Sequence, residues 1–191
     1  MRLTPKDIII PVLMIVMIIT SCTPACTPCD DPELTEVGSS STLRLQFEVS
    51  TAVRHSNGTA ASSIAIASHG DNIPISLADS VTTNVYLTGI DTTSGVKCVE
   101  LKGGFGLTCQ NLGGGSAISL HGILPNPRQC LPLTRCCLKN NRIAIEDLSQ
   151  FMRCPSGQRV QSGGIQVVGI VQSCEGRTDT AILSFEPMLV F

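Results

Sequence analysis

Ten cysteines in 191 residues constrain this chain more than any other feature of its sequence. Reduced thiols in that number would be a liability unless they bound metal, whereas disulfide bonds persist in oxidising compartments. Aromatic residues make up only 3% of the chain, with no Trp and one Tyr, so any core has to be built from Val, Ile, Leu and Ala. Covalent bridges that restrict the unfolded chain would supplement such a core. The cysteines therefore predict a disulfide-stabilised domain that works outside the cytoplasm.

The N-terminal segment has the three parts of an export signal. Arg2 and Lys6 precede an apolar run over residues 8–19, and the small residues Thr20 and Ser21 follow it. About twelve apolar residues span only about 18 Å as a helix, against roughly 30 Å for the hydrocarbon core of a bilayer. Residues 1–21 are therefore predicted to be a signal peptide and not a permanent transmembrane anchor.

The end of this segment resembles a known processing signal. Ile19-Thr20-Ser21-Cys22 is similar to the lipobox of bacterial lipoproteins: a branched apolar residue, two small residues and the cysteine that receives the diacylglyceryl group. The resemblance covers these four positions. It implies cleavage before Cys22, lipidation of Cys22 and attachment to a membrane through that lipid anchor. Thr at position 23, rather than Asp, resembles the second mature residue of a lipoprotein sorted to the outer membrane of a diderm, which implies a place in the outer membrane or periplasm.

The competing interpretation is a soluble secreted protein that is cut after Ser21 or Ala25, both small residues. Cysteine parity favours it, because all ten cysteines can pair only if Cys22 keeps its thiol. The sequon Asn57-Gly58-Thr59 would accept a glycan in a eukaryotic secretory pathway. Both interpretations place the mature chain outside the cytoplasm.

The mature chain divides into a lead-in and a domain. Residues 22–41 are rich in Pro, Asp, Glu, Thr and Ser and have almost no apolar periodicity, so they are predicted to be a flexible tether. The domain is predicted to cover residues 42–191. Its clearest strand lies at 43–50, where Leu43, Leu45, Phe47 and Val49 alternate with polar residues.

Further strands and one short helix follow from the same signals. A second alternating segment runs over 81–88, and Leu148, Phe151 and Met152 could share one face of a helix of one or two turns at 146–152. Short segments bounded by Gly, Asn, Asp, Pro or Ser are further strand candidates, at 64–67, 97–101, 105–110, 117–124, 142–146, 164–172 and 180–185. Many short strands with turns between them predict an all-β fold, an antiparallel β-sandwich compatible with Greek-key links.

One disulfide can be argued from a predicted hairpin. A two-residue turn at Gly103-Gly104 would place Cys98 directly opposite Cys109, within bridging distance. A register shifted by one residue gives a better apolar face but sets Cys98 against Thr108. The Cys98–Cys109 bridge is the favoured alternative, since a bulge at the glycines would reconcile the two demands.

The segment 125–155 differs from the rest of the domain. It combines four cysteines with prolines and basic residues, and it has little periodicity before Arg142, so it is predicted to be a disulfide-stapled loop excursion from the sandwich. Its adjacent Cys136 and Cys137 are expected to bond in different directions, for example to Cys130, Cys154 or Cys174. The full set of disulfide candidates is Cys26, Cys29, Cys98, Cys109, Cys130, Cys136, Cys137, Cys154 and Cys174.

Several classes of site are disfavoured by charge and spacing. The net charge is -2 and no basic block is present, which argues against a nucleic-acid partner. Cys22, Cys26 and Cys29 have a spacing that resembles the iron–sulfur loop of radical enzymes that use S-adenosylmethionine, but those are cytosolic barrels far longer than this chain. Cys26 and Cys29 lack the strand and helix of a thioredoxin-like motif, and an oxidising compartment favours disulfides over zinc. We expect no metal and no cofactor.

Catalysis also lacks a sequence signal. His55, His69 and His121 are scattered, and no G-x-S-x-G elbow occurs. The sequence therefore predicts a non-enzymatic envelope protein with a binding or structural role. Its partner would be a protein or a glycan, and the sequence does not identify which. A small secreted hydrolase or redox protein is the weakest alternative.

Overall fold

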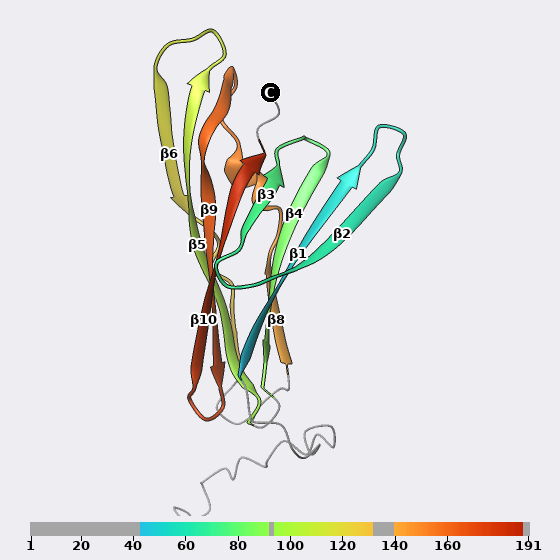
Figure 1. Cartoon of the computed structure of the whole chain (residues 1–191), viewed down its shortest axis with the longest axis vertical. Coiled ribbons are helices and arrows are strands. Elements are labelled where there is room, and N and C mark those ends of the chain that lie inside the picture. Colours follow the sequence, from blue (N-terminus) through green and yellow to red (C-terminus); the bar gives the residue numbers. More distant parts are fainter. Residues whose placement is uncertain (1–42, 92–93, 132–139, 189–191) are drawn as a thin grey trace, which may run out of the picture.

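The computed structural model describes residues 43–91, 94–131 and 140–188. These residues form two β-sheets packed face to face, and the strands run along the long axis of the molecule (Figure 1). The predicted all-β sandwich is confirmed. The predicted signal peptide (1–21) and tether (22–41) lie outside the described residues, as do Cys22, Cys26, Cys29, Cys136 and Cys137.

The first sheet has four strands, all antiparallel to their neighbours. Its strands, in spatial order, are β2 (Ala60–Ala67), β1 (Arg44–Arg54), β4 (Val81–Ile90) and β8 (Asn140–Ile145). The strand predicted from alternation at 43–50 is confirmed as β1. Its residues Phe47 and Val49 are buried and lie opposite Leu87 and Val85 of β4. β4 repeats this pattern along its whole length.

The second sheet is larger and contains the longest strands. Its strands, in spatial order, are β3 (Asn72–Ser76), β10 (Thr178–Met188), β9 (Gln158–Ser173), β5 (Val96–Asn111) and β6 (Ala117–Ile123), while β7 (Arg128–Cys130) also pairs with β5. One pairing departs from the antiparallel prediction, since β3 runs parallel to β10. Parallel strands cannot be joined by a tight hairpin. β3 and β10 are not joined in this way, because the chain enters β3 from β2 in the other sheet.

The chain passes between the sheets repeatedly, so strands that follow one another in sequence are often not neighbours. β4 lies beside β1 although β2 and β3 come between them in the chain, and β9 lies beside β5 although β6, β7 and β8 come between them. A fourth strand that returns beside the first is the connection of a Greek key, although here β3 belongs to the opposite sheet.

The core lies between the two sheets and is built mainly of Val, Leu and Ile. Its largest fully buried side chains include the aromatic rings of Phe47 and Phe185. Gly169 permits one close contact: a Cβ at that position would lie 2.7 Å from the ring of Phe47. The first sheet therefore packs directly against the backbone of β9 at its centre.

The predicted hairpin at Gly103-Gly104 is wrong. β5 continues through both glycines as one strand of sixteen residues, paired with β9 on one side and with β6 and β7 on the other. Gly103 is required by packing and not by a turn, because a Cβ there would meet the backbone oxygen of Gln166 and lie 2.8 Å from Cδ1 of Leu124. Cys98 and Cys109 therefore lie far apart on the same strand.

The segment 125–155 is more closely integrated into the sandwich than its sequence suggested. Its described parts include β7 in the second sheet, β8 in the first and a 3₁₀-helix, η2 (Leu148–Met152), in place of the predicted helix. Leu148 and Met152 are buried, and the ring of Phe151 lies 6.0 Å from that of Phe105. Residues 132–139 of the segment lie outside the described residues.

Candidate functional site

All five cysteines in the described residues are disulfide-bonded. Cys98 pairs with Cys130, and Cys109 pairs with Cys154, so the predicted Cys98–Cys109 bridge is wrong. Cys174 is bonded as well. Because Cys130 and Cys154 have partners on β5, they are no longer available to Cys136 or Cys137.

The two described bridges both fasten the segment 125–155 to β5. Cys98 and Cys130 are direct cross-strand neighbours with a Cα–Cα distance of 4.1 Å, and their bridge holds the three-residue strand β7 at the edge of β5. Cys109 is fully buried and its bridge to Cys154 fixes the chain directly after η2, with a Cα–Cα distance of 5.8 Å. Each bridge therefore ties a short element of this segment to the long strand β5.

A groove with a volume of about 770 Å³ opens between the two sheets where β1 lies close to β10. Its apolar part includes the buried residues Phe47, Ala67 and Ala181. Polar residues of its lining come from both sheets and include Arg44 and Gln46 on β1, His69 after β2, and Asp179 and Thr180 on β10. The groove thus brings apolar residues of the core together with polar groups from both sheets.

Two polar side chains of the groove are already engaged with the backbone. His69 Nδ1 accepts a hydrogen bond from the backbone N–H of Ile182 at 3.1 Å. Asp179 Oδ1 accepts one from the backbone N–H of Thr180 at 2.9 Å. These contacts satisfy donors along an edge of β10 that β3 does not cover, since β3 pairs only with Ser184–Met188.

The three histidines are not brought together. His55 lies in the turn between β1 and β2, where its backbone N–H donates to the carbonyl oxygen of Thr59, while His121 lies on β6 in the other sheet. His69 is the only one of them in the groove. In the described chain no group of three or more His, Cys, Asp or Glu could hold a metal ion. Among the described residues, the three histidines therefore lie at three separate places on the sandwich.

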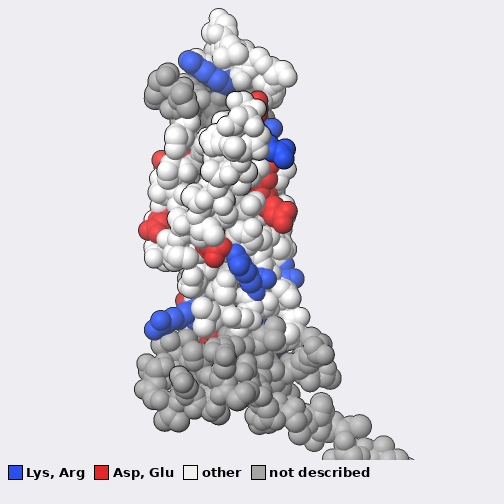
Figure 2. Space-filling model, turned by 90° about the vertical axis from the view of Figure 1, so that its right-hand side faces the viewer, with Lys and Arg blue, Asp and Glu red and all other residues white. Residues whose placement is uncertain are grey.

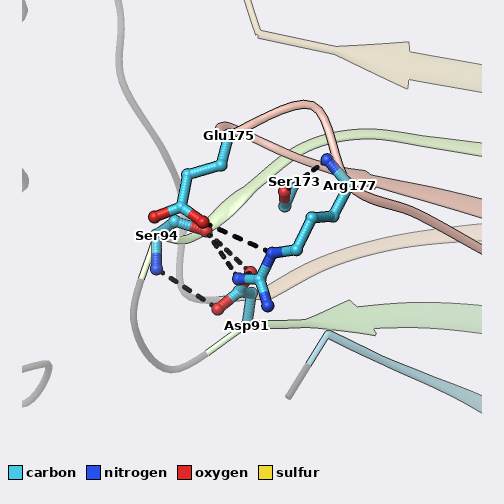
Figure 3. A network of polar contacts seen from close by, with 5 residues as sticks. All are labelled: Asp91, Ser94, Ser173, Glu175 and Arg177. Carbon is cyan, nitrogen blue, oxygen red and sulfur yellow. Dashed lines mark hydrogen bonds and ion pairs between the residues drawn. The ribbon is translucent and has the colours of Figure 1, made fainter. Parts of the chain in front are cut away.

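A buried ion pair, which sequence reasoning missed, closes one end of the sandwich (Figure 3). The carboxylate of Asp91 is fully buried and accepts hydrogen bonds from Arg177 Nη2 and Ser94 Oγ, both at 2.8 Å. Arg177 Nε also lies 3.3 Å from Glu175 Oε2, and the Arg177 backbone N–H donates to Ser173 Oγ at 3.0 Å. The network joins the segment after β4 to the turn between β9 and β10, so we interpret it as structural.

A second charged group lies on the outer face of the first sheet and is exposed. Arg142 of β8 pairs with Glu48 of β1, and its guanidinium lies 4.2 Å from the ring centre of Tyr86 on β4, which is between them. On the side of the molecule where β2 lies, Figure 2 shows charged side chains of both signs, scattered with wide uncharged areas between them. The described residues on that side form no block of one charge that would select a polyanion or a polycation.

Comparisons with known proteins identify no family. No family model matches the chain, and no curated protein matches it. The solved structures found include a β-glucosidase from Listeria innocua in complex with glucose, with 12% identity and a TM-score of 0.28. The complex of that enzyme with isofagomine gives the same values. In both cases 81% of this chain is covered but only 17% of the other, and a likeness this weak carries no argument about function.

Within the described residues, no helix is long and apolar enough to cross a bilayer.

Proposed function

We propose that this chain is an exported, disulfide-stabilised β-sandwich protein of the cell envelope, held at a membrane through an acylated Cys22 and serving a binding or structural role. The observation that carries the proposal is that every described cysteine is disulfide-bonded. Such bonds persist outside the cytoplasm and are rare within it. An oxidised domain that follows an export-like leader supports an extracytoplasmic location.

The predicted anchor and the folded domain are separated by a suitable length of chain. Twenty-one residues lie between Cys22 and Arg44, where β1 begins. Fully extended, they would reach at most about 70–75 Å. A domain on such a tether could present its whole surface while several acyl chains keep it at the membrane.

A binding role suits the described surface better than catalysis does. The groove between β1 and β10 offers apolar floor residues and polar groups from both sheets. His69 and Asp179, the groups there that resemble catalytic residues, are occupied with backbone N–H groups. We therefore propose the groove as the site for a ligand, without a reaction.

The anchor is tested by comparing two single variants of neighbouring cysteines. Cys22→Ser is expected to release the exported protein from the membrane fraction, whereas Cys26→Ser, the matched control, should leave it there. The intact mass of the N-terminal peptide should show the added acyl groups only when Cys22 is present. Membrane association that survives Cys22→Ser, or a peptide mass without lipid, would remove the anchor from the proposal.

The oxidised state is tested independently of the anchor. Thiol titration of the exported protein, unfolded without reductant, should find none of the five described cysteines free. Detection of free thiol at Cys98, Cys109, Cys130, Cys154 or Cys174 would contradict the proposed compartment.

The alternative of a soluble secreted protein is favoured by one specific observation. Asn57 is exposed at the tip of the hairpin formed by β1 and β2, and its Oδ1 accepts hydrogen bonds from the Thr59 backbone N–H at 3.0 Å and from Thr59 Oγ1 at 2.7 Å. The sequon is thus accessible. A glycan found on Asn57 of the native protein, together with an unlipidated N-terminus, would establish this alternative.

A further inference from the structure

β2 is an edge strand that has a free side. It lies at the end of the first sheet and pairs only with β1, through a continuous register from Phe47↔Ala67 to Arg54↔Ala60. No backbone partner lies on its other side among the described residues, and Figure 1 shows it at the outside of the molecule. The exposed N–H and C=O groups of an edge strand are a template for pairing with another chain.

The side chains of β2 do not protect this edge. Its sequence, AASSIAIA, contains no charged residue and no proline over eight residues. Ile64 and Ile66 point to the outer face of the sheet, opposite Ser50 and Glu48, and are 64% and 61% exposed. Residues 61, 63 and 65, on the inner face, are exposed as well, because no strand of the second sheet covers this end of β2.

Two of the other three edges carry the protection that β2 lacks. β3 is five residues long and contains Pro74, and β8 contains Arg142. Short length, proline and charge are the usual means by which edge strands avoid pairing. The fourth edge is shared by β6, which is uncharged apart from His121, and by β7, which is three residues long and carries Arg128. β2 is therefore the edge best suited to accept a further strand.

The best-suited occupant of this edge is a second copy of the same strand. β2 has no charge, so two antiparallel copies bring no like charges together, whereas β8 would meet its own Arg142. A two-fold axis through Ser63, perpendicular to the sheet, would set Ala60 opposite the second copy's Ile66. Both pairs of isoleucines would then lie on one common outer face. Closed two-fold pairing is also the commonest way in which identical chains associate.

We propose that two copies of this protein associate through antiparallel pairing of their β2 strands, which joins the two four-stranded sheets into one continuous sheet of eight. The surface argued for is the backbone edge of 60–67 with Ile64 and Ile66 beside it. The association depends on residues of the described domain alone, so it does not require the lipid anchor proposed above.

The test is made on the Cys22→Ser protein. It carries no acyl chain, whether the native protein is lipidated on Cys22 or simply secreted. Sedimentation velocity over a wide range of protein concentration should show a monomer that becomes a dimer, and no larger species. Ile64→Lys should raise the dissociation constant about two- to fivefold, because the two new charges are diagonal neighbours across the two-fold axis. Ile123→Lys is the matched control, since Ile123 is 86% exposed on β6, and it should leave the dimer unchanged.

A second measurement keeps the test decisive if Ile64→Lys fails to fold. In the unsubstituted Cys22→Ser protein, amide hydrogen exchange of the peptide 60–67 should slow as protein concentration rises, while that of β6 should not. A monomer at all concentrations, or exchange in β2 that is independent of concentration, would overturn the proposal. Open-ended oligomers that Ile123→Lys abolishes would overturn it too, because they would show pairing of β2 with β6.

Discussion

β5 and β2 are both strands of the same sandwich, but they are stabilised in opposite ways. β5 has strand neighbours on both sides, buries Val99, Leu101 and Leu107, and carries both described disulfides. β2 has one neighbour and no disulfide, and seven of its eight residues are exposed. Both described disulfides are thus on β5, and β5 buries far more apolar surface than β2 does. The free edge of the first sheet contributes little to the fold, which leaves it available for contacts with other molecules.

The largest loss of stability is expected from removing the buried Cys109–Cys154 bridge on β5. Replacing Cys109 and Cys154 together with Ala opens a loop with a sequence separation of 45 residues. A chain-entropy estimate for a loop of that size gives a loss of about 4 kcal/mol in the free energy of unfolding. Chemical denaturation of the exported protein measures it. A loss below about 1 kcal/mol would mean that β5 is not the centre of stability.

The two bridges also offer an internal comparison. Cys109 is completely buried, whereas Cys130 is exposed on β7. Because thiol–disulfide exchange requires access to a sulfur atom, mild reductant should open Cys98–Cys130 before Cys109–Cys154. Alkylation of the released thiols and peptide mapping would show which bridge opens first. Earlier opening of Cys109–Cys154 would contradict the burial of Cys109.

The next largest effect is expected at the buried ion pair. Arg177→Ala leaves the carboxylate of Asp91, which is fully buried, without its cation. We expect a loss of about 2–3 kcal/mol, below the cost for a pair that is buried at both ends, because the Arg177 side chain is 38% exposed. Thermal or chemical unfolding measures the change.

Arg142→Ala is the matched control for this prediction. It removes an exposed pair with Glu48 and a contact with Tyr86, so it should cost no more than about 1 kcal/mol. Equal losses for the two arginine variants would mean that the burial of Asp91 does not set the strength of its ion pair.

A smaller effect is expected where a side chain caps a strand edge. His69→Ala removes the acceptor for the backbone N–H of Ile182, an exposed site where water can replace it in part. The expected loss of stability is about 1 kcal/mol. His55→Ala is the control, because the hydrogen bonds that His55 makes with Thr59 and Gly58 use its backbone atoms, and it should change stability little. If the two variants behave alike, the cap on β10 has no energetic role.

The sequence predicted the strands that bury one face and missed those that depend on distant contacts. Alternation at 43–50 and 81–88 gave β1 and β4 because the buried face of each strand repeats every second residue. β3 and β7 were missed: each is short, and the first contains Pro74. Gly103-Gly104 signals a turn when only local geometry is considered, whereas its role is a close approach to Gln166 on another strand.

The candidate sites were less predictable than the fold for the same reason. Asp91 and Arg177 are 86 residues apart, and nothing in either local sequence indicates that they pair. The groove is lined by residues of β1, β2, β4 and β10 and of the turn after β2, which only the order of strands brings together. The cysteines predicted an oxidised domain correctly, but their pairing followed from β5 being one strand instead of two.

The smallest effect is expected on the free edge, where it separates folding from association. Ile64→Thr keeps a β-branched residue on β2 and exposes no core, so dilute protein should lose no more than about 0.5 kcal/mol. Ile145→Ala in β8, where the side chain is only 2% exposed, should cost about 2–5 kcal/mol at any concentration. If β2 pairs with a second copy, the wild-type protein should gain stability as its concentration rises, and Ile64→Thr should gain less. A difference between the two proteins that is already large at high dilution would show that β2 supports the fold itself, and the contrast with β5 would fail.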